Sequence, residues 1–253
     1  MQGEGVLDSW LDLVHGAACV GCLTPGRSLC PRCASELPAR GTAVRPTPCP
    51  AGLAACFAGG AYDDLLRAMI LAHKEHATFS LAAPLGRVLA AAVSRALGPD
   101  SATVLVPVPS RPVVVRARGH DPVLRFTRAA GRELRGSGHR VRVAQVLEQR
   151  GSVHDQAGLT AGERAANLTG SMGVRANARA ALARTRRPLS LLVCDDVLTT
   201  GATAREAQRA LEDTGLPIRA VVTVAATRKR FPPPARLSGP PSGWALPLSG
   251  NAT

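Results

Sequence analysis

The chain has 253 residues, of which 45% are hydrophobic, 3% are aromatic and 19% are charged. This hydrophobic content supports a buried core and excludes a chain that is disordered throughout. The shortage of aromatic residues predicts a core of Leu, Val and Ala and argues against aromatic platforms for stacking bases. The 31 basic residues exceed the 18 acidic ones, for a formal net charge of +13. Because the arginines are scattered along the chain, a generally basic surface and a nucleic-acid surface explain this charge equally well.

The most apolar stretch, residues 81–97, is interrupted by Arg87 and Arg95, so the sequence predicts no membrane span. The N-terminus carries acidic residues where a signal peptide has basic ones. We therefore expect a cytoplasmic protein. Thiols stay reduced in that compartment, so the seven cysteines point to metal binding or core packing before disulfides.

The N-terminal half predicts an amphipathic helix at residues 7–14 and then an irregular stretch, rich in Cys and Pro, at 19–56. A strand is expected at 58–61 and a helix through 65–70. Ser80 is the expected N-cap of a further helix.

The C-terminal half alternates strands with helices, which is typical of a doubly wound, mostly parallel α/β sheet. The predicted strands are 103–109, 141–147, 189–194 and 218–225. After the first strand comes a basic loop, and then a helix that starts with Asp121 as N-cap and Pro122 at its first position. A short helix with capping-box spacing is expected from Thr160, and the last helix is expected to run through Leu211 with Gly215 as its C-cap.

Two adjacent carboxylates, Asp195 and Asp196, follow the predicted strand 189–194, at the strand end where α/β proteins bind ligands. The next loop supplies backbone N–H groups and hydroxyls at a helix N-terminus, and these form an anion cradle. Its residues are Thr199, Thr200, Gly201, Ala202 and Thr203. A ribose 5-phosphate group presents both hydroxyls and a phosphate, so we expect this ligand class rather than an unliganded, N-capped helix. No G-x-G-x-x-G follows a strand, and no Walker loop is present.

A second candidate loop follows the predicted strand 103–109. It carries groups suited to a diphosphate, namely Ser110, Arg111, Arg116 and Arg118. Alone it is as easily a solvated basic loop, but both loops would open at the same edge of a parallel sheet. Lys74 is a further candidate for a pyrophosphate contact, and a solvated residue at a helix end explains it about as well.

Two C-x-x-C pairs are separated by seven residues near the N-terminus, and their cysteines are Cys19, Cys22, Cys30 and Cys33. Four thiolates at this spacing predict a closed, structural zinc site, in preference to two redox or packing pairs. Cys49 and Cys56 lie outside these pairs, and they are either a remnant of another pair or packed thiols. Cys194 is expected in the core.

Residues 191–203 resemble the phosphoribosyl pyrophosphate motif of type I phosphoribosyltransferases. Over residues 6–228 the chain resembles the ComF family, phosphoribosyltransferase-like proteins associated with competence for DNA uptake. Beside the leading helix and the Cys pairs, this resemblance rests on Tyr62-Asp63 with Leu66 and Lys74, Val-Pro-Val-Pro at 106–109 with Arg118-Gly119, the segment from Gln156-x-x-Leu159 to Arg164-x-x-Asn167, and Asp195-Asp196. One departure is His120-Asp121-Pro122, where the family often has Phe-Asn-Gln.

Residues 231–253 are rich in Pro, Gly and Ser and carry almost no charge, which predicts a disordered tail. The resemblance implies a type I phosphoribosyltransferase-like domain at residues 58–230, after a helix and zinc module at 1–57. It implies that Asp195 and Asp196 bind the ribose hydroxyls, as catalytic residues, and that the loop at 199–203 holds the 5-phosphate. Phosphoribosyl pyrophosphate would bind with Mg²⁺, and the phosphoribosyl group would pass to a nitrogen acceptor.

Two alternatives to this enzyme stay open. One is a non-catalytic, nucleotide-sensing accessory protein that binds single-stranded DNA or a DNA-uptake helicase. The other is a salvage enzyme with no link to DNA.

Overall fold

The computed structural model describes residues 18–98, 102–150, 168–178 and 189–227. The helix predicted at 7–14, the helix predicted from Thr160 and the tail from Phe231 lie outside these residues, as does the segment that contains Gln156 and Asn167. Within the described residues, no helix has the length and apolar character needed to cross a membrane.

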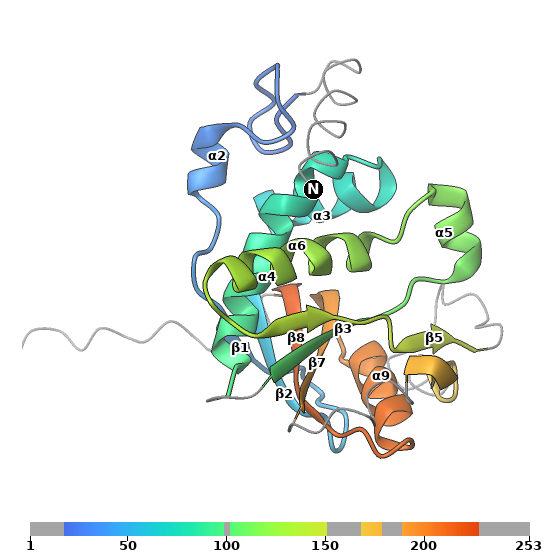
Figure 1. The fold of residues 1–253 in the computed structure, drawn as a ribbon. Helices are drawn as coiled ribbons and strands as arrows, with labels where there is room; N and C mark the ends of the chain where they lie inside the picture. The colour runs from blue at the N-terminus through green and yellow to red at the C-terminus, as the bar shows by residue number, and fades with distance from the viewer. Residues whose placement is uncertain (1–17, 99–101, 151–167, 179–188, 228–253) are drawn as a thin grey trace, which may run out of the picture.

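Six strands form the central sheet, in the order β1-β2-β8-β7-β3-β4 (Figure 1). The first pair is antiparallel and every other neighbouring pair is parallel, so the prediction of an α/β protein with a mostly parallel sheet is confirmed. In sheet order the strands are β1 (Thr42–Val44), β2 (Ala55–Ala61), β8 (Ile218–Ala226), β7 (Leu189–Leu198), β3 (Ala102–Pro107) and β4 (Val141–Val143). A separate antiparallel pair consists of β5 (Leu147–Gln149) and β6 (Met172–Val174).

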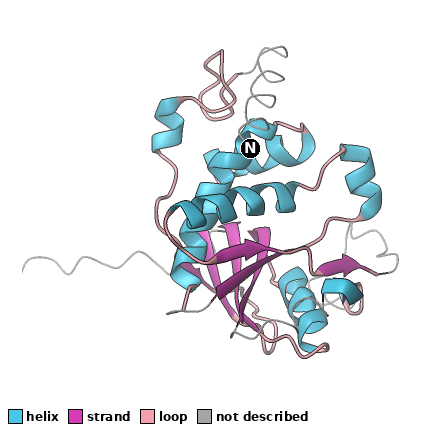
Figure 2. Ribbon diagram, viewed as in Figure 1, coloured by secondary structure: helices cyan, strands magenta, loops and turns pink. Residues whose placement is uncertain are grey.

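Helices cover both faces of the sheet (Figure 2). One face packs against α4 (Ala82–Ala96) and α6 (Pro122–Gly136), and the opposite face packs against α9 (Ala202–Glu212). Further helices with described bounds are α2 (Pro31–Ser35), α3 (Asp64–Glu75), the 3-10 turn η1 (Phe79–Leu81) and α5 (Pro112–Arg118), and residues 176–178 are also helical.

The residues of β7 divide between the two cores as the alternation of a strand requires. Leu192 and Cys194 belong to the core on the α4 and α6 side, whereas Leu191 and Val193 belong to the core on the α9 side. A strand that is buried on both faces has no polar alternation, which explains the continuous apolar run in the sequence. Cys194 is fully buried, as expected for a core residue.

Helix boundaries agree with the sequence signals at the start of α6 and the end of α9, and they differ at the start of α4. Asp121 is the N-cap of α6, where its Oδ1 accepts a hydrogen bond from Leu124 N at 3.1 Å. Ser80 is not an N-cap, because it lies inside the 3-10 turn and Leu81 caps α4 instead. The helix α9 ends at Glu212, and Gly215, with a φ of 76°, terminates it as predicted: Gly215 N donates to Glu212 O at 2.9 Å and Leu216 N donates to Leu211 O at 3.0 Å.

Three further predictions need correction. The strand expected at 141–147 is two strands, β4 and β5, which belong to different sheets. The basic loop after β3 contains α5, which has Pro112 at its first turn and ends at Gly119 with a φ of 72°. The strand expected to end at 194 continues to Leu198 as β7. In addition, β2 begins at Ala55, three residues before the strand predicted at 58–61.

Candidate functional site

Asp195 and Asp196 lie on β7 beyond the point where its neighbour β3 ends. The last β3 pair is Pro107 with Cys194, and Val108 N then donates to Cys194 O at 2.9 Å before the chain leaves the sheet. On the other side, β7 continues to pair with β8 as far as Leu198. The two carboxylates are therefore held on a regular strand, beside a place where the sheet has opened.

Lys74, at the end of α3, reaches these carboxylates. Its Nζ donates to Asp196 Oδ2 at 2.7 Å, while Asp196 Oδ1 accepts from Val197 N at 2.7 Å. Asp195 Oδ1 accepts from Asp196 N at 2.8 Å. The side chain of Asp196 is only 15% exposed. One lysine therefore balances two partly buried carboxylates, which leaves a local negative charge when both are ionised.

The electrostatics of this group favour a cationic or hydrogen-donating ligand. Burial raises the pKa of Asp195 well above its ordinary value, and the neighbouring charge of Asp196 raises it further. Burial lowers the pKa of Lys74, but the charges of Asp196 and Asp195 outweigh that effect and raise it overall. A ligand that donates hydrogen bonds to both carboxylates would relieve the repulsion between them.

The loop at residues 199–203 forms the start of α9. Gly201 is the N-cap with a φ of 78°, a left-handed conformation that favours glycine. Thr200 Oγ1 accepts a hydrogen bond from Ala202 N at 3.4 Å, and Arg205 N donates to Gly201 O at 2.8 Å. Because the first amides of a helix have no partner within the helix, this loop can bind an anion through its backbone.

A segment that the sequence analysis left without a role supports this loop. Residues 45–54 pack against the first turns of α9, where Gln208 accepts from Ala54 N at 2.9 Å and donates to Gly52 O at 2.8 Å. Arg205 Nε donates to Ala51 O at 3.0 Å. The partners are about 150 residues apart in the chain, so no local pattern predicts the contact.

Only one of the arginines in the loop after β3, Arg118, lies at the end of α3. Arg118 Nη2 lies 2.7 Å from both carboxylate oxygens of Glu75, the residue after Lys74. The Ser110 hydroxyl lies 3.3 Å from Asp121 Oδ1, so Ser110 is tied to the N-cap of α6. Arg111 and Arg116 are exposed, and within the described residues no ion pair joins them to the carboxylates. The structure thus groups Lys74, Arg118 and the Asp pair, and leaves two predicted arginines at the surface.

Two histidines that the sequence analysis did not pair hold this arrangement together. His120 Nε2 lies 3.1 Å from His73 O, and His120 Nδ1 lies 3.1 Å from Arg118 O. The His120 ring packs edge-on against Phe79, and Arg125 lies 4.2 Å over the same phenyl ring. His73 is 1% exposed, and burial lowers its pKa to about 4, helped by the nearby charges of His120 and Arg125.

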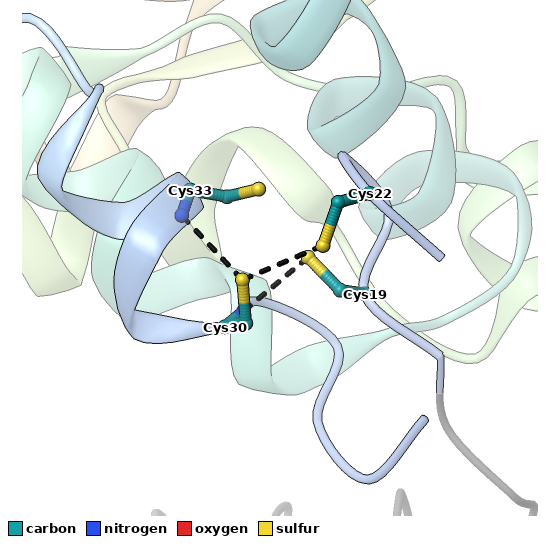
Figure 3. Close-up of side chains that lie close together, drawn as sticks. All are labelled: Cys19, Cys22, Cys30 and Cys33. Atoms are coloured by element: carbon teal, nitrogen blue, oxygen red, sulfur yellow. Dashed lines mark hydrogen bonds between the residues drawn. The ribbon is translucent and has the colours of Figure 1, made fainter. Parts of the chain in front are cut away.

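The four N-terminal cysteines, Cys19, Cys22, Cys30 and Cys33, converge on one point and form a four-cysteine cluster (Figure 3). Their Sγ atoms all lie within 4.8 Å of one another, and Cys22 and Cys30 are 3.6 Å apart. A tetrahedral zinc ion with Zn–S bonds of about 2.3 Å has S···S edges of about 3.8 Å, so this donor set fits such an ion. Cys30 also caps α2 and accepts from Cys33 N at 3.5 Å.

The thiols of this four-cysteine cluster differ in acidity. Hydrogen bonds from the Thr24 side chain and backbone, together with Cys30, lower the pKa of Cys22 to about 6. Burial and the neighbouring thiols raise the pKa of Cys33 to about 12. A bound cation would stabilise all four thiolates together, since coordination requires their deprotonated form. Within the described residues, Cys49, Cys56 and Cys194 are not part of the cluster.

The four-cysteine cluster is docked on the core beside α3. A Cβ on Gly21 would lie 2.7 Å from Leu65 Cδ1 and 2.9 Å from Cys33 Sγ, so a larger residue here would displace one of these side chains. Val20, Leu29 and Leu37 pack against the core on the α4 and α6 side. The cluster therefore braces the start of the helix whose far end carries Lys74.

Comparison with known proteins adds no family to this description. No protein-family model matches the chain, and no curated protein matches it. The fold and site thus define an α/β protein with a mostly parallel six-stranded sheet and a cluster of four cysteines.

Proposed function

We propose that this chain is a phosphoribosyltransferase-like protein that binds phosphoribosyl pyrophosphate with Mg²⁺ and transfers the phosphoribosyl group to a nitrogen acceptor. The observation that carries the proposal is the position of Asp195 and Asp196 on β7. They lie beside Lys74, and the Gly201-led start of α9 follows within five residues.

The ligand's groups match the chemistry of these residues. The carboxylates of Asp195 and Asp196 accept hydrogen bonds from the two ribose hydroxyls, and Asp196 exchanges part of its contact with Lys74 for them. The amides and hydroxyls of residues 199–203 bind the 5-phosphate. Lys74 reaches Asp196 from the end of α3, and Arg118 binds the adjacent Glu75, so that both cationic groups are available to the pyrophosphate.

The reaction forms one bond and breaks one. The acceptor nitrogen gives its electron pair to the anomeric carbon, and the bond from that carbon to the pyrophosphate oxygen breaks as that oxygen keeps its pair. The nitrogen then loses its proton to solvent. When bound, Mg²⁺ neutralises charge on the substrate's oxygens. The protein's part is to hold the ribose between the carboxylates and the phosphate loop and to stabilise the leaving group with cations.

We also propose zinc as the ion of the four-cysteine cluster, in a structural role. All four ligand positions are thiolates, so the site has no open position for catalysis. The surrounding residues 18–41 bury few apolar side chains of their own, and an ion would supply the missing stabilisation. The link to DNA uptake stays a prediction from the family resemblance.

Calorimetric titration of phosphoribosyl pyrophosphate with Mg²⁺ tests the function. The wild type is expected to bind, and Asp195→Asn/Asp196→Asn, which keeps the shape of both side chains, is expected to lose binding by at least tenfold. Circular dichroism and zinc content of the variant control for its fold. Equal binding by both proteins would remove the assignment. A screen of amines and bases for pyrophosphate release then identifies the acceptor.

A further inference from the structure

One ion pair, between Lys74 and Asp196, joins side chains that the proposed function assigns to different parts of the ligand. Lys74 Nζ donates to Asp196 Oδ2 at 2.7 Å. Asp196 is one of the carboxylates proposed to bind the ribose hydroxyls, whereas Lys74 is proposed to bind the pyrophosphate. Each part of the ligand therefore needs a side chain that is already paired with the side chain meant for the other part.

Both members of this pair are occupied by their present contacts. Asp196 Oδ1 accepts from Val197 N at 2.7 Å, and Asp196 Oδ2 accepts from Lys74. Among the residues that the structure describes, Asp196 is the only hydrogen-bond partner of Lys74 Nζ. The side chain of Asp196 is 15% exposed and that of Lys74 is 37% exposed. The pair therefore lies at the boundary between the core and the solvent, where a ligand can reach both charges.

A ligand that breaks the pair from one side alone leaves a charge without its partner. Pyrophosphate alone would take Lys74 and leave the charge of Asp196 next to that of Asp195, with which it shares a strand. A sugar phosphate alone would occupy Asp196 with hydroxyls and leave the ammonium group of Lys74 unpaired. A partly buried charge that loses its partner costs free energy, because water replaces that partner only in part. A ligand that carries both parts avoids both costs.

We propose that the Lys74–Asp196 pair couples the binding of the sugar to that of the pyrophosphate, and so makes the site selective for a ligand that carries both. This inference rests on the proposed function, because it assigns the sugar hydroxyls to Asp196. When the hydroxyls bind Asp196, the ammonium group of Lys74 is released to the pyrophosphate. Binding of either part then strengthens binding of the other by the same factor, as linkage requires. Inorganic pyrophosphate and sugar phosphates each carry one part, and each binds more weakly for that reason.

Arg118 provides a matched comparison within the same site. Its Nη2 lies 2.7 Å from both carboxylate oxygens of Glu75, and Glu75 is not one of the carboxylates assigned to the sugar. Arg118 can therefore bind the pyrophosphate without exchanging a partner with the sugar. Substitution of Arg118 is expected to weaken pyrophosphate binding and to leave the coupling in place, whereas substitution of Lys74 is expected to remove the coupling.

Two half-ligands measure the coupling by calorimetry. One is inorganic pyrophosphate, and the other is 1,4-anhydroribitol 5-phosphate, a ribose 5-phosphate without the anomeric hydroxyl, which leaves room for the pyrophosphate. The coupling factor is the ratio of the pyrophosphate dissociation constants of the full chain without and with a saturating amount of this sugar phosphate. We expect a factor of at least fivefold in the wild type and in Arg118→Gln, and a factor at least fivefold smaller in Lys74→Met. One fixed Mg²⁺ concentration keeps any contribution of the metal common to all three proteins.

Nuclear magnetic resonance can follow the exchange at the lysine itself. Lys74 and Lys229 are the only lysines of the chain, so ¹³C-labelled lysine gives two Cε signals, and Lys74→Met identifies the one from Lys74. The sugar phosphate alone is expected to shift the Lys74 signal, because it displaces the ammonium group from Asp196. The Lys229 signal serves as the internal reference.

The outcomes separate this inference from the proposed function. Equal coupling factors in the wild type and in Lys74→Met would overturn the inference, as would a bound sugar phosphate that does not move the Lys74 signal. The proposed function would stand in either case, provided that phosphoribosyl pyrophosphate binds the wild type and not Asp195→Asn/Asp196→Asn. Failure of phosphoribosyl pyrophosphate to bind the wild type would overturn the proposed function, and this inference with it.

Discussion

Acid is expected to destabilise this protein through one buried histidine, His73. Its Nδ1 lies 3.2 Å from Thr78 O, and its Nε2 is buried with no hydrogen-bond partner. Burial lowers the pKa of His73 to about 4, whereas an unfolded chain has a value of about 6.5. The unfolded state therefore binds more protons between these values, and stability must fall as the pH falls through this window.

The size of the effect follows from the two pKa values. Between pH 7 and pH 5, the linkage relation gives a loss of about 2 kcal/mol in the free energy of unfolding from His73 alone. The consequence extends to the site, because His73 precedes Lys74 and its carbonyl lies 3.1 Å from His120. Protonation would loosen the contact between α3 and α6 that places Lys74 beside Asp196.

Urea unfolding of the wild type and of His73→Asn at pH 7, 6 and 5 measures this contribution. Asparagine keeps a donor near the Nδ1 position and does not titrate. We expect His73→Asn to be less stable at pH 7, because it leaves a cavity, but to lose about 2 kcal/mol less than the wild type on going to pH 5. Equal pH slopes in the two proteins would refute the reasoning, since every other titrating group is common to both.

Three further predictions concern the rest of the molecule. The full chain is expected to carry one zinc ion per molecule by mass spectrometry, and Cys33→Ser to lose it while Cys49→Ser, outside the cluster, retains it; equal zinc content in both variants would contradict the four-cysteine site. Gly201→Ala is expected to destabilise the chain by about 1 kcal/mol and to weaken the binding of phosphoribosyl pyrophosphate, because φ is 78° and the new Cβ lies 3.0 Å from Leu53 Cδ2. The control is Gly215→Ala, where φ is a similar 76° but the new Cβ meets open space, so calorimetry should show unchanged affinity. Glu206→Gln is expected to cost about 2 kcal/mol in urea unfolding, because Glu206 is 4% exposed and accepts bonds from Arg209 and Met172 N. Burial raises the pKa of Glu206, but the hydrogen bonds from Arg209 and Met172 N outweigh burial and lower the pKa overall. The stability that Glu206 contributes is therefore present above about pH 4.3, the pKa of an unfolded Glu, and is lost in more acidic solution. The pH profile of Glu206→Gln should lack this loss.

Local patterns in the sequence were sufficient for much of the fold. The apolar run before Asp195 predicted a central strand because burial on both faces removes any alternation. Asp121 with Pro122 predicted the start of α6, since a side-chain acceptor and a missing N–H both suit the first turn. The spacing of the N-terminal cysteines predicted a cluster that the structure forms, with every Sγ within 4.8 Å of the others.

Other features could be predicted only in part or not at all. Helix α5 has Pro112 at its start and Gly119 at its end, which are signals of helix ends. None of its residues is buried, so the sequence between these signals has no apolar face and resembles a basic loop. The continuation of β7 to Leu198 had no local signal, because Asp is rare in strands. The extension depends on pairing with β8, where Asp195 lies opposite Thr223 and Leu198 opposite Ala226. The ion pair between Lys74 and Asp196 joins residues 122 positions apart, so only the fold brings them together.

The segment 120–122 connects α5 to α6, and its three residues each have a structural role. His120 joins the loop after α5 to His73 O, Asp121 holds both the start of α6 and Ser110, and Pro122 occupies the first turn of that helix. The contact of His120 with His73 O fixes the loop against the end of α3, where Arg118 meets Glu75 and Lys74 meets Asp196. Replacement of His120 should therefore disturb the position of Arg118 and Lys74 more than the stability of α6, whose cap is Asp121. The end of α3, rather than either loop alone, is the point at which the candidate site is assembled.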